Sequence, residues 1–381
     1  MTAAARPGAA RIVDLPAGHR DDPPGRAGLA GLAARVLTSP ANGGAAARAA
    51  ALGWHTRHRL SARCSSFAFW SSDPADLDDI LGDLRSARLP DGDAGLAVLD
   101  ALRARQAAAS GGRLDTPLAR VGRVLERAAW GTPEEDVLGS AATLAAVTAA
   151  DLRHALDDLT ARAWVHDEAA VPGPPAAASP AAAAAEPVAG RGWSGGLAVA
   201  DHPGSDARVA VRLAVADPAP DLLDVLVEVL GNGPDGRLHR ELRHRHALAY
   251  GFTATCWAED RTASIGATAT VAAENAAAAV RVLATTLRGL AGGVPRSEWD
   301  VARWRSRAGL LAALDGPFGL VDEARRRAHG ERLVAERCAA VSLLTDPPPL
   351  CLAPDPPAVA AVGVFDPRHR RQLADAYQEI R

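Results

Sequence analysis

"LGNGPDGRLHRELRHRHALAYGF" spans Leu230–Phe252, and this stretch decides the fold. A glycine-rich turn leads into a short polar helix, in which Leu238 and Leu242 are four residues apart and predict one buried stripe. The helix breaks through "HALAY" into a strand. Tyr250, one of only two tyrosines in the chain, therefore follows Arg243 by seven positions, across a corner between a helix and a strand.

On both sides of this corner, the spacing of apolar residues predicts a succession of strands and helices. "ARVAVRLAVA" (Ala207–Ala216) has the period of a strand, and "APDLLDVLVEVLG" that of a helix with Asp221 in its first turn and Gly231 past its end. "ALAYGFTATCWA" and "ASIGATATVA" predict two paired strands around the turn "EDRT". Two helices follow, the second with Ser297 as its expected N-cap, and then a strand, "VAAVGVF". This order predicts an α+β domain with an antiparallel sheet.

The N-terminal half repeats this kind of pattern. "SARCSSFAFWSS" (Ser61–Ser72) and "RAWVHDEA" predict strands, and "DPADLDDILGDL" and "AAVTAADLRHALDDL" predict helices. Little sequence precedes Gly18, so we expect this half to lack one edge strand. The Ala/Pro-rich segment 171–192 reads as a linker, which divides the chain into an N-terminal domain (1–170) and a C-terminal domain (193–381) of similar fold.

Composition excludes several classes of protein. All 42 basic residues are arginine and the net charge is −3, so no overall basic field indicates nucleic-acid binding. The Arg-rich stretch "EARRRAHGERL" is expected to be a solvated helix face. No apolar run is long enough to span a membrane and no signal-peptide pattern opens the sequence, so we expect a soluble, cytoplasmic protein. The four cysteines lack CxxC spacing and are expected to be reduced and mostly buried.

Two pairs of histidines are weak candidates for metal binding. His55 and His58 have a spacing that could bring them together on a helix, and His244 and His246 lie near a helix end. His55 and His58 have no carboxylate close by in the sequence and are predicted to be surface histidines. His244 and His246 are predicted to point to different faces of the helix and to line its end.

Leu230–Phe252 resembles the second domain of the pitrilysin/insulinase family of zinc peptidases, above all the two-domain subunits such as those of the mitochondrial processing peptidase. In that family a glycine-rich turn precedes Ser-Arg-Leu, a helix end with Glu and Arg, and Gly-Leu-Ala-Tyr. Here these elements stand as Gly236-Arg237-Leu238, Glu241-Leu242-Arg243 and Ala247-Leu248-Ala249-Tyr250. The resemblance implies an α+β half-clamshell of two similar domains, each a mainly antiparallel sheet packed against helices.

The same resemblance explains "GHRDDPPGRAGLAGLAARVL" (Gly18–Leu37). The family has a similar turn here, followed on a helix by the zinc motif His-x-x-Glu-His. Gly31, Ala34 and Arg35 stand at the positions of the first His, the Glu and the second His. The family's downstream carboxylate ligand is expected in Leu96–Ser110, where the positions near Ala108 and Ala109 carry alanine. The resemblance therefore implies no metal in this chain and no peptidase activity of its own.

What the chain retains of the family's site is Arg243 and Tyr250, which the resemblance implies hold substrate and stabilise the oxyanion beside a partner's zinc. We therefore expect a non-catalytic, substrate-binding subunit of a heterodimeric zinc metallopeptidase that cleaves a peptide, by family analogy a leader peptide. One alternative is a non-proteolytic scaffold or peptide-binding homodimer of the same fold. Another is that Arg243 only caps a helix and Tyr250 only packs on the sheet.

Overall fold

The structure, a computed structural model, describes residues 8–61, 64–131, 138–167, 192–216, 219–231, 233, 235–259 and 262–381. The expected linker 171–192 lies outside the described residues except for Gly192. The chain divides into two compact units: unit 1 comprises Met1–Gly112, Glu135–Glu186 and Ala312–Val334, and unit 2 comprises Arg113–Glu134, Pro187–Leu311 and Ala335–Arg381. Each unit therefore includes one segment from the opposite half of the sequence.

Unit 1 is built on a four-stranded antiparallel sheet in the order β2-β3-β1-β4. Its strands are β1 (Ala9–Leu15), β2 (His55–Leu60), β3 (Ser65–Ser71) and β4 (Trp164–Asp167). No strand was predicted before Gly18, and this prediction is wrong. The segment forms β1, an inner strand, because "AARIVDL" places Val13 and Leu15 on one face and Ile12 and Asp14 on the other.

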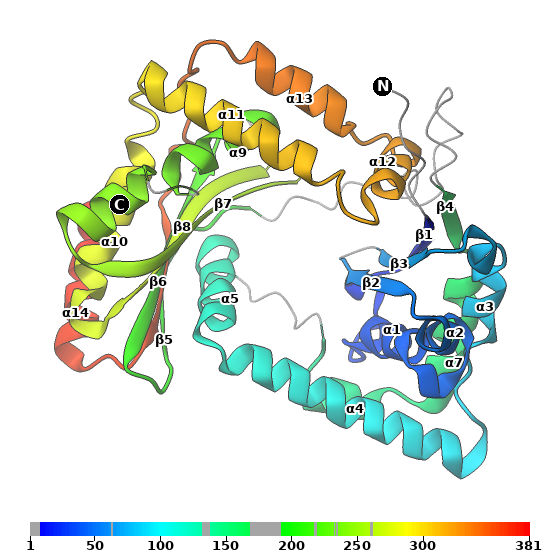
Figure 1. The fold of residues 1–381 in the computed structure, drawn as a ribbon. Coiled ribbons are helices and arrows are strands. Elements are labelled where there is room, and N and C mark those ends of the chain that lie inside the picture. Colours follow the sequence, from blue (N-terminus) through cyan, green and yellow to red (C-terminus); the bar gives the residue numbers. More distant parts are fainter. Residues whose placement is uncertain are drawn as a thin grey trace. The chain divides into compact units, whose positions relative to one another are not determined.

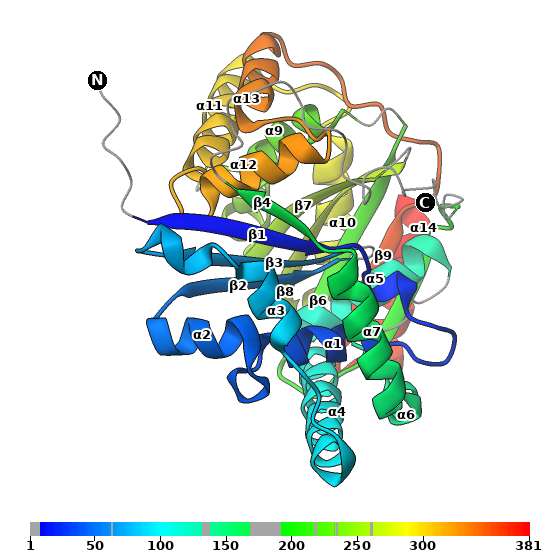
Figure 2. The same ribbon diagram turned by 90° about the vertical axis from the view of Figure 1, so that its right-hand side faces the viewer.

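Helices cover one face of this sheet, as Figure 2 shows. They are α1 (Leu29–Thr38), α2 (Gly44–Leu52), α3 (Ile80–Ser86), α4 (Gly92–Asp115), α6 (Ala141–Ala146) and α7 (Ala149–Ala161). Their apolar side chains form one core with Val13 and Leu15 of β1 and Phe67 and Phe69 of β3. Burial of this core is the main force that holds α1 on the sheet.

The opposite face of the sheet is covered by α12 (Gly319–Ala328), which comes from the C-terminal half of the sequence. Val321 is fully buried against Ile12 and Ala68 of the sheet. Asp322 accepts two hydrogen bonds from Arg57 of β2, at 2.7 and 3.0 Å. The Arg-rich stretch is therefore not simply a solvated helix, because one side of α12 packs on unit 1.

Unit 2 contains a five-stranded sheet in the order β5-β9-β6-β8-β7, antiparallel except for the pair β5–β9. The strands are β5 (Gly196–Asp201), β6 (Asp206–Val215), β7 (Ala249–Glu259), β8 (Thr262–Ala272) and β9 (Ala358–Gly363). The predicted strand 207–216 and the predicted pair around "EDRT" correspond to β6, β7 and β8. The α+β class with two sheets packed against helices is thus confirmed.

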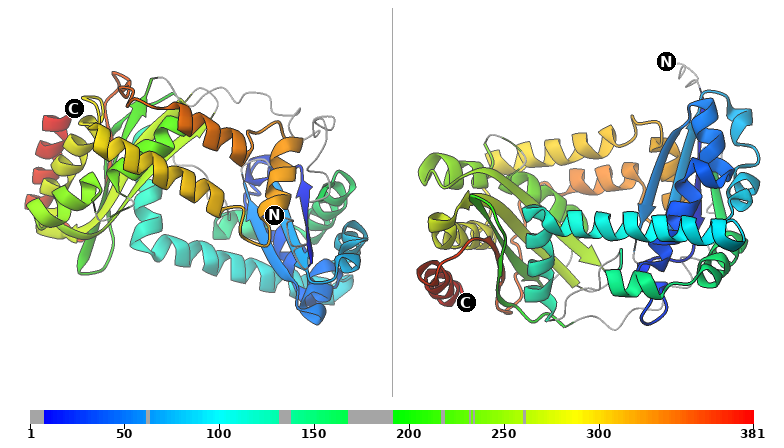
Figure 3. Two further views of the ribbon diagram at one scale, coloured as in Figure 1. Left: turned by 45° about the horizontal axis from the view of Figure 1, so that its top comes forward. Right: turned by 90° about the horizontal axis from the view of Figure 1, so that it is seen from below.

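One face of this second sheet packs against helices in a large apolar core. The helices of unit 2 on this side are α9 (Pro220–Leu230), α10 (Ala276–Arg288), α11 (Arg296–Ala312), α13 (Val334–Leu343) and α14 (Pro367–Ile380). Figure 3 shows α11 beside α13, where Arg303 donates to the backbone oxygens of Val341 and Ser342. Since α11 already begins at Arg296, the prediction of Ser297 as its N-cap is wrong by a residue or two.

The other face of the second sheet receives α5 (Pro117–Trp130), from the N-terminal half of the sequence (Figure 1). Small side chains of the sheet, among them Ala210, Ala358 and Ala360, pack against this helix. Arg212 of β6 donates to Glu126 of α5 at 2.6 Å. In each unit, a helix from the opposite half of the sequence therefore covers the second face of the sheet: α12 in unit 1 and α5 in unit 2.

The four cysteines are free thiols, as expected, but only Cys338 is buried and Cys351 is exposed. The expectation that they are mostly buried was wrong. Among the described residues, no helix combines the length and the apolar character needed to cross a bilayer.

Candidate functional site

Helix α1 is positioned by the turn that precedes it. The two carboxylate oxygens of Asp22 accept hydrogen bonds from the backbone N–H groups of Gly28, at 2.7 Å, and Ala30, at 2.8 Å. A carboxylate at this place satisfies donors that a helix start leaves unpaired. Burial raises the pKa of Asp22 to about 6, although these backbone hydrogen bonds act to lower it. The turn is therefore a structural support for α1.

Gln106 of α4 faces α1 where the resemblance places the zinc motif. The Gln106 side chain is fully buried, and its Nε2 donates to the backbone oxygens of Gly28, at 2.7 Å, and Leu138, at 2.8 Å. Its Oε1 accepts a hydrogen bond from Nε of Arg35 at 3.0 Å. A Cβ added to Gly31 would lie 2.9 Å from Gln106 Nε2, closer than real Cβ atoms come. Gln106 was not predicted from the sequence. It lies in the same helix as Ala108 and Ala109, close to the positions at which the resemblance places the family's carboxylate ligand.

This arrangement does not fit a zinc ion. Gly31 and Ala34 carry no donor atom, and Arg35 is a cation whose pKa is lowered by burial and by Arg105. Zinc sites in proteins use imidazole, thiolate or carboxylate ligands, and a guanidinium repels the ion. The three positions therefore support no zinc-dependent step.

The paired histidines of the sequence are also not metal ligands. His55 and His58 lie on strand β2, not on a helix, so their side chains point to opposite faces of the sheet. The His55 ring lies 5.2 Å from Trp70, and the His58 ring stacks on Phe67 at 4.6 Å. His244, near the end of a helix as expected, packs on His239 at 4.7 Å.

Arg243 and Tyr250 come together at one corner of unit 2. Arg243 lies on the π-helix η5 (His239–Arg245), which is anchored by the fully buried Leu242. The Cζ atom of Arg243 is 5.4 Å from the centre of the Tyr250 ring, within the range of a cation–π interaction. Tyr250 is 87 % exposed, so it does not pack on the sheet.

Two local irregularities of the backbone produce this corner. Ala247 adopts a left-handed conformation with φ of 51°, which turns the chain from the helix toward β7. The pairing of β7 with β8 shifts between Ala249 and Gly251, so Tyr250 is the extra residue of a β-bulge. A bulge redirects the side chain of the residue that it adds. The corner therefore places Tyr250 in solvent, beside Arg243.

Arg237, Arg240 and Arg243 form a row of arginines at intervals of three residues. Arg243 differs from the other two. Arg237 and Arg240 both pair with Glu298, at 2.9 and 2.5 Å. Within the part of the chain that the structure describes, the guanidinium of Arg243 has no carboxylate partner and no hydrogen bond. It is thus the arginine of this row that can contact a ligand without first losing an ion pair.

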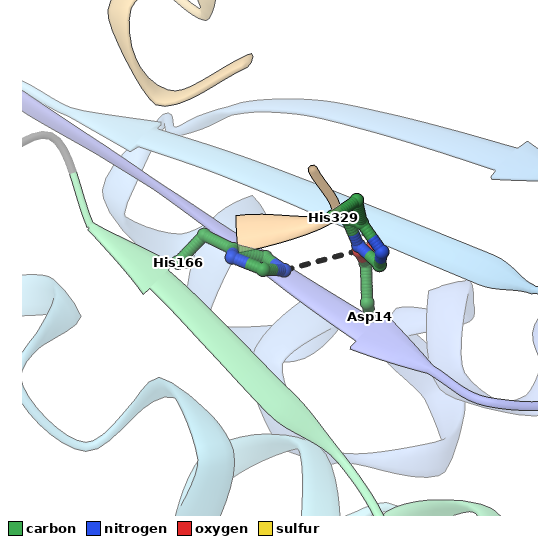
Figure 4. Close-up of side chains that lie close together, drawn as sticks. All are labelled: Asp14, His166 and His329. Carbon is green, nitrogen blue, oxygen red and sulfur yellow. Dashed lines mark hydrogen bonds and ion pairs between the residues drawn. The ribbon is translucent and has the colours of Figure 1, made fainter. Parts of the chain in front are cut away.

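A second cluster, in unit 1, joins three residues that the sequence analysis did not single out. Oδ2 of Asp14 accepts hydrogen bonds from Nε2 of His166, at 3.1 Å, and from Nε2 of His329, at 2.8 Å (Figure 4). Ser66 donates to the other carboxylate oxygen at 2.5 Å. Burial raises the pKa of Asp14, but the hydrogen bonds from His166, His329 and Ser66 lower it below its usual range. No local motif marks this cluster, because its residues lie far apart in the sequence.

Residues 206–306 match the family model described as the peptidase M16 inactive domain. Residues 206–306 are therefore similar to an M16 inactive domain. The Arg243–Tyr250 corner lies inside this matched segment, and the resemblance to the pitrilysin-like peptidases is confirmed. Gly31, Ala34 and Arg35 of α1 stand in place of the zinc motif and supply no zinc ligand, which agrees with a non-catalytic M16-like protein.

Solved structures agree in fold over nearly the whole chain. A peptidase M16 inactive domain from Pseudomonas fluorescens is 15% identical, with a TM-score of 0.72 over 94% of this chain and 93% of that chain. A protease from Helicobacter pylori is 14% identical, with a TM-score of 0.68 over 94% of each chain. A chain of complex III from Candida albicans is 11% identical, with a TM-score of 0.65 over 97% of this chain and 95% of that chain. No curated protein matches.

Proposed function

We propose that this chain is the non-catalytic, substrate-binding subunit of a cytoplasmic, heterodimeric zinc metallopeptidase of the M16 type. A partner subunit of the same family supplies the zinc ion. Arg243 and Tyr250 complete the partner's active site, where they hold the peptide backbone and stabilise the oxyanion of the tetrahedral intermediate. The substrate is a peptide, by analogy a leader peptide of a modified-peptide precursor.

The single observation that carries this proposal is the exposed Arg243–Tyr250 pair in an M16 domain. A cation with no carboxylate partner among the described residues and a phenolic hydroxyl in solvent are suited to meet developing negative charge. The left-handed Ala247 and the bulge at Tyr250 keep both groups in place. Backbone strain of this kind is common at functional sites.

Strand β7 offers a further reason to expect a peptide. It is the last strand in the described part of its sheet and pairs only with β8. Thr253 and Thr255 are exposed along it, beyond Tyr250. An outer strand edge can add an extended peptide through backbone hydrogen bonds.

The experiment is co-purification with a partner that bears His-x-x-Glu-His, followed by peptide-cleavage kinetics. We expect Arg243→Ala to lower kcat by about 10²-fold, the usual cost of a lost oxyanion-stabilising group. Tyr250→Phe removes only the hydroxyl and keeps the ring beneath the guanidinium, so its effect isolates the phenol. Tyr250→Ala removes both and should lower cleavage further.

Matched controls are available in the same unit. Arg245 lies on the same helix and pairs with Glu241 at 2.9 Å, and Tyr377 is the other tyrosine of the chain. Arg245→Ala and Tyr377→Phe should leave cleavage unchanged. Unchanged cleavage in both Arg243→Ala and Tyr250→Phe would refute the composite site.

A second candidate function is a non-proteolytic scaffold or peptide-binding homodimer of the same fold. The similarity in fold to a chain of complex III from Candida albicans favours it. Purification as a homodimer, with no zinc-bearing partner and no cleavage, would select this function over the first.

A further inference from the structure

We propose that Asp14, His166 and His329 bind a divalent transition-metal ion, best matched by Zn²⁺, on the face of the unit 1 sheet that α12 covers. This site is separate from the degenerate motif, because α1 packs on the opposite face. The sequence led us to expect no metal in this chain, and this proposal replaces that expectation.

The backbone brings the first two ligands together. Ile12 of β1 pairs with His166 of β4, and Asp14 lies two residues further along β1. Asp14 and His166 therefore share one face of adjacent strands, as diagonal neighbours. His329 ends α12 and approaches from above the sheet, so three elements distant in sequence converge on one point.

The three ligand atoms could bind one metal ion if the distances between them increased slightly. The three ligand atoms all lie within 4.8 Å of one another. Ligands about 2.0–2.2 Å from a tetrahedral zinc ion lie roughly 3.3–3.6 Å from each other. The present separations of 2.8 and 3.1 Å, from Asp14 Oδ2 to the two Nε2 atoms, need to grow by only a few tenths of an ångström.

The burial of charge favours a cation at this point. Asp14 is 1 % exposed and His166 4 % exposed, and the described structure gives Asp14 no arginine partner. A buried carboxylate needs a compensating positive charge or several hydrogen bonds. Two imidazoles with a carboxylate form a ligand set typical of zinc and other first-row ions. The hydroxyl of Ser66 donates to the second oxygen of Asp14 and orients it, as outer-shell groups do around metals.

A cavity lies beside one of the three ligands, His329, and beside Ser66. Its volume is about 330 Å³, and Ser66, Cys64 and His329 are among the residues that line it. Cys64 is not one of the three converging ligands, although its thiol lies close enough to hydrogen-bond with Asp14 and with Ser66 Oγ, the latter at 3.6 Å. A water molecule is therefore the expected fourth ligand. The ion would tie the end of α12 to the sheet of unit 1.

The test is metal binding by the purified full-length chain, with Zn²⁺ and then Co²⁺ as the probes. We expect about one zinc ion per chain to remain after dialysis, by mass spectrometry of the metal content. Co²⁺ should give the visible absorption of a tetrahedral site without a thiolate charge-transfer band. Zn²⁺ should also slow hydrogen exchange in α12.

Variants decide whether these residues hold the ion. His166→Ala and His329→Ala should each weaken Zn²⁺ binding by at least ~10-fold. Asp14→Asn keeps the shape and should weaken binding too, which covers the case that His166→Ala fails to fold. Two controls should bind as the wild type does: His154→Ala, at an exposed site on α7, and His58→Ala, on the other side of the sheet.

Two results would overturn the inference. One is that the folded wild-type chain retains no zinc. The other is that zinc is retained equally by the wild type, His329→Ala and Asp14→Asn. Neither result bears on the roles of Arg243 and Tyr250, which are tested by cleavage.

Discussion

Arg35 donates its Nε hydrogen to Oε1 of Gln106 at 3.0 Å, at the position in α1 that the M16 resemblance gives to the second zinc histidine. Gln106 in turn bridges the backbone oxygens of Gly28 and Leu138. The loss of the zinc motif is therefore not a simple removal of ligands. A hydrogen-bonded network of Arg35, Gln106 and two backbone oxygens occupies this place in unit 1.

The first prediction concerns the contact between Gly31 and Gln106. Gly31→Ala should destabilise the protein by about 1–3 kcal/mol, because the new Cβ would lie 2.9 Å from an amide that two backbone oxygens hold in place. Denaturant unfolding followed by tryptophan fluorescence measures the loss. The double variant Gly31→Ala/Gln106→Ala should lose less than the sum of the single changes, since removal of the amide relieves the clash.

Gly122 of α5 provides the control, because a Cβ added there meets nothing within 4 Å. Gly122→Ala should be neutral or stabilising by up to about 1 kcal/mol. Equal stability of Gly31→Ala and the wild type would contradict this account of the site.

The second prediction concerns the strained Ala247. This residue has φ of 51°, and the family pattern has glycine here. The left-handed conformation costs a residue with a Cβ about 1–2 kcal/mol, part of which the greater entropy of unfolded glycine offsets. Ala247→Gly should therefore stabilise unit 2 by up to about 1 kcal/mol in thermal unfolding. Ala247→Val should do the opposite, and a stabilising effect of valine would refute the strain.

The third prediction concerns the dependence of stability on pH at Asp22. The pKa of Asp22 in the folded protein is about 6, above the value of about 3.9 for an unfolded chain. The folded state therefore holds this proton more tightly, and the stabilisation that protonation provides is lost as pH rises from about 4 through 6. Because Asp22 is partly exposed, we expect about 1–2 kcal/mol rather than the full value of the shift.

Asp22→Asn cannot titrate and tests this prediction. The difference in free energy of unfolding between wild type and Asp22→Asn should move against the wild type as pH rises from 4.5 to 7.5 (values chosen to bracket a pKa of about 6). Parallel pH profiles of the two proteins would contradict the raised pKa.

The fourth prediction concerns the docking of α12 on unit 1. Val321 is fully buried against the sheet, so Val321→Ala should loosen this helix by about 1–3 kcal/mol. Hydrogen exchange of the α12 backbone amides measures the local effect. Val301 of α11 is 46 % exposed, and Val301→Ala should leave exchange in α12 unchanged. Unchanged exchange in Val321→Ala would show that α12 does not depend on the Val321 contact.

Most of the elements of unit 2 could be predicted from the sequence, because their patterns are local. Apolar side chains alternate along β6, and this pattern predicts a strand with one buried face. Leu238 and Leu242 are four residues apart, and this spacing predicts that both are buried on one side of a helix. The short β1 was missed since its seven residues precede the first recognisable turn. The spacing of His55 and His58 would bring them together on a helix, but pairing with β3 makes that segment a strand.

By itself, the sequence determined the α+β class, the M16 resemblance, the absence of zinc ligands at Gly31, Ala34 and Arg35, and the seven-residue spacing of Arg243 and Tyr250. These are properties of local pattern and residue type. Only the tertiary structure decided that α5 and α12 pack on the sheet formed by the opposite half of the sequence, that Gln106 faces Gly31, and that Asp14, His166 and His329 converge. An amphipathic helix reveals that it has an apolar face but not which sheet covers it, and contacts between distant residues exist only once the strands are paired.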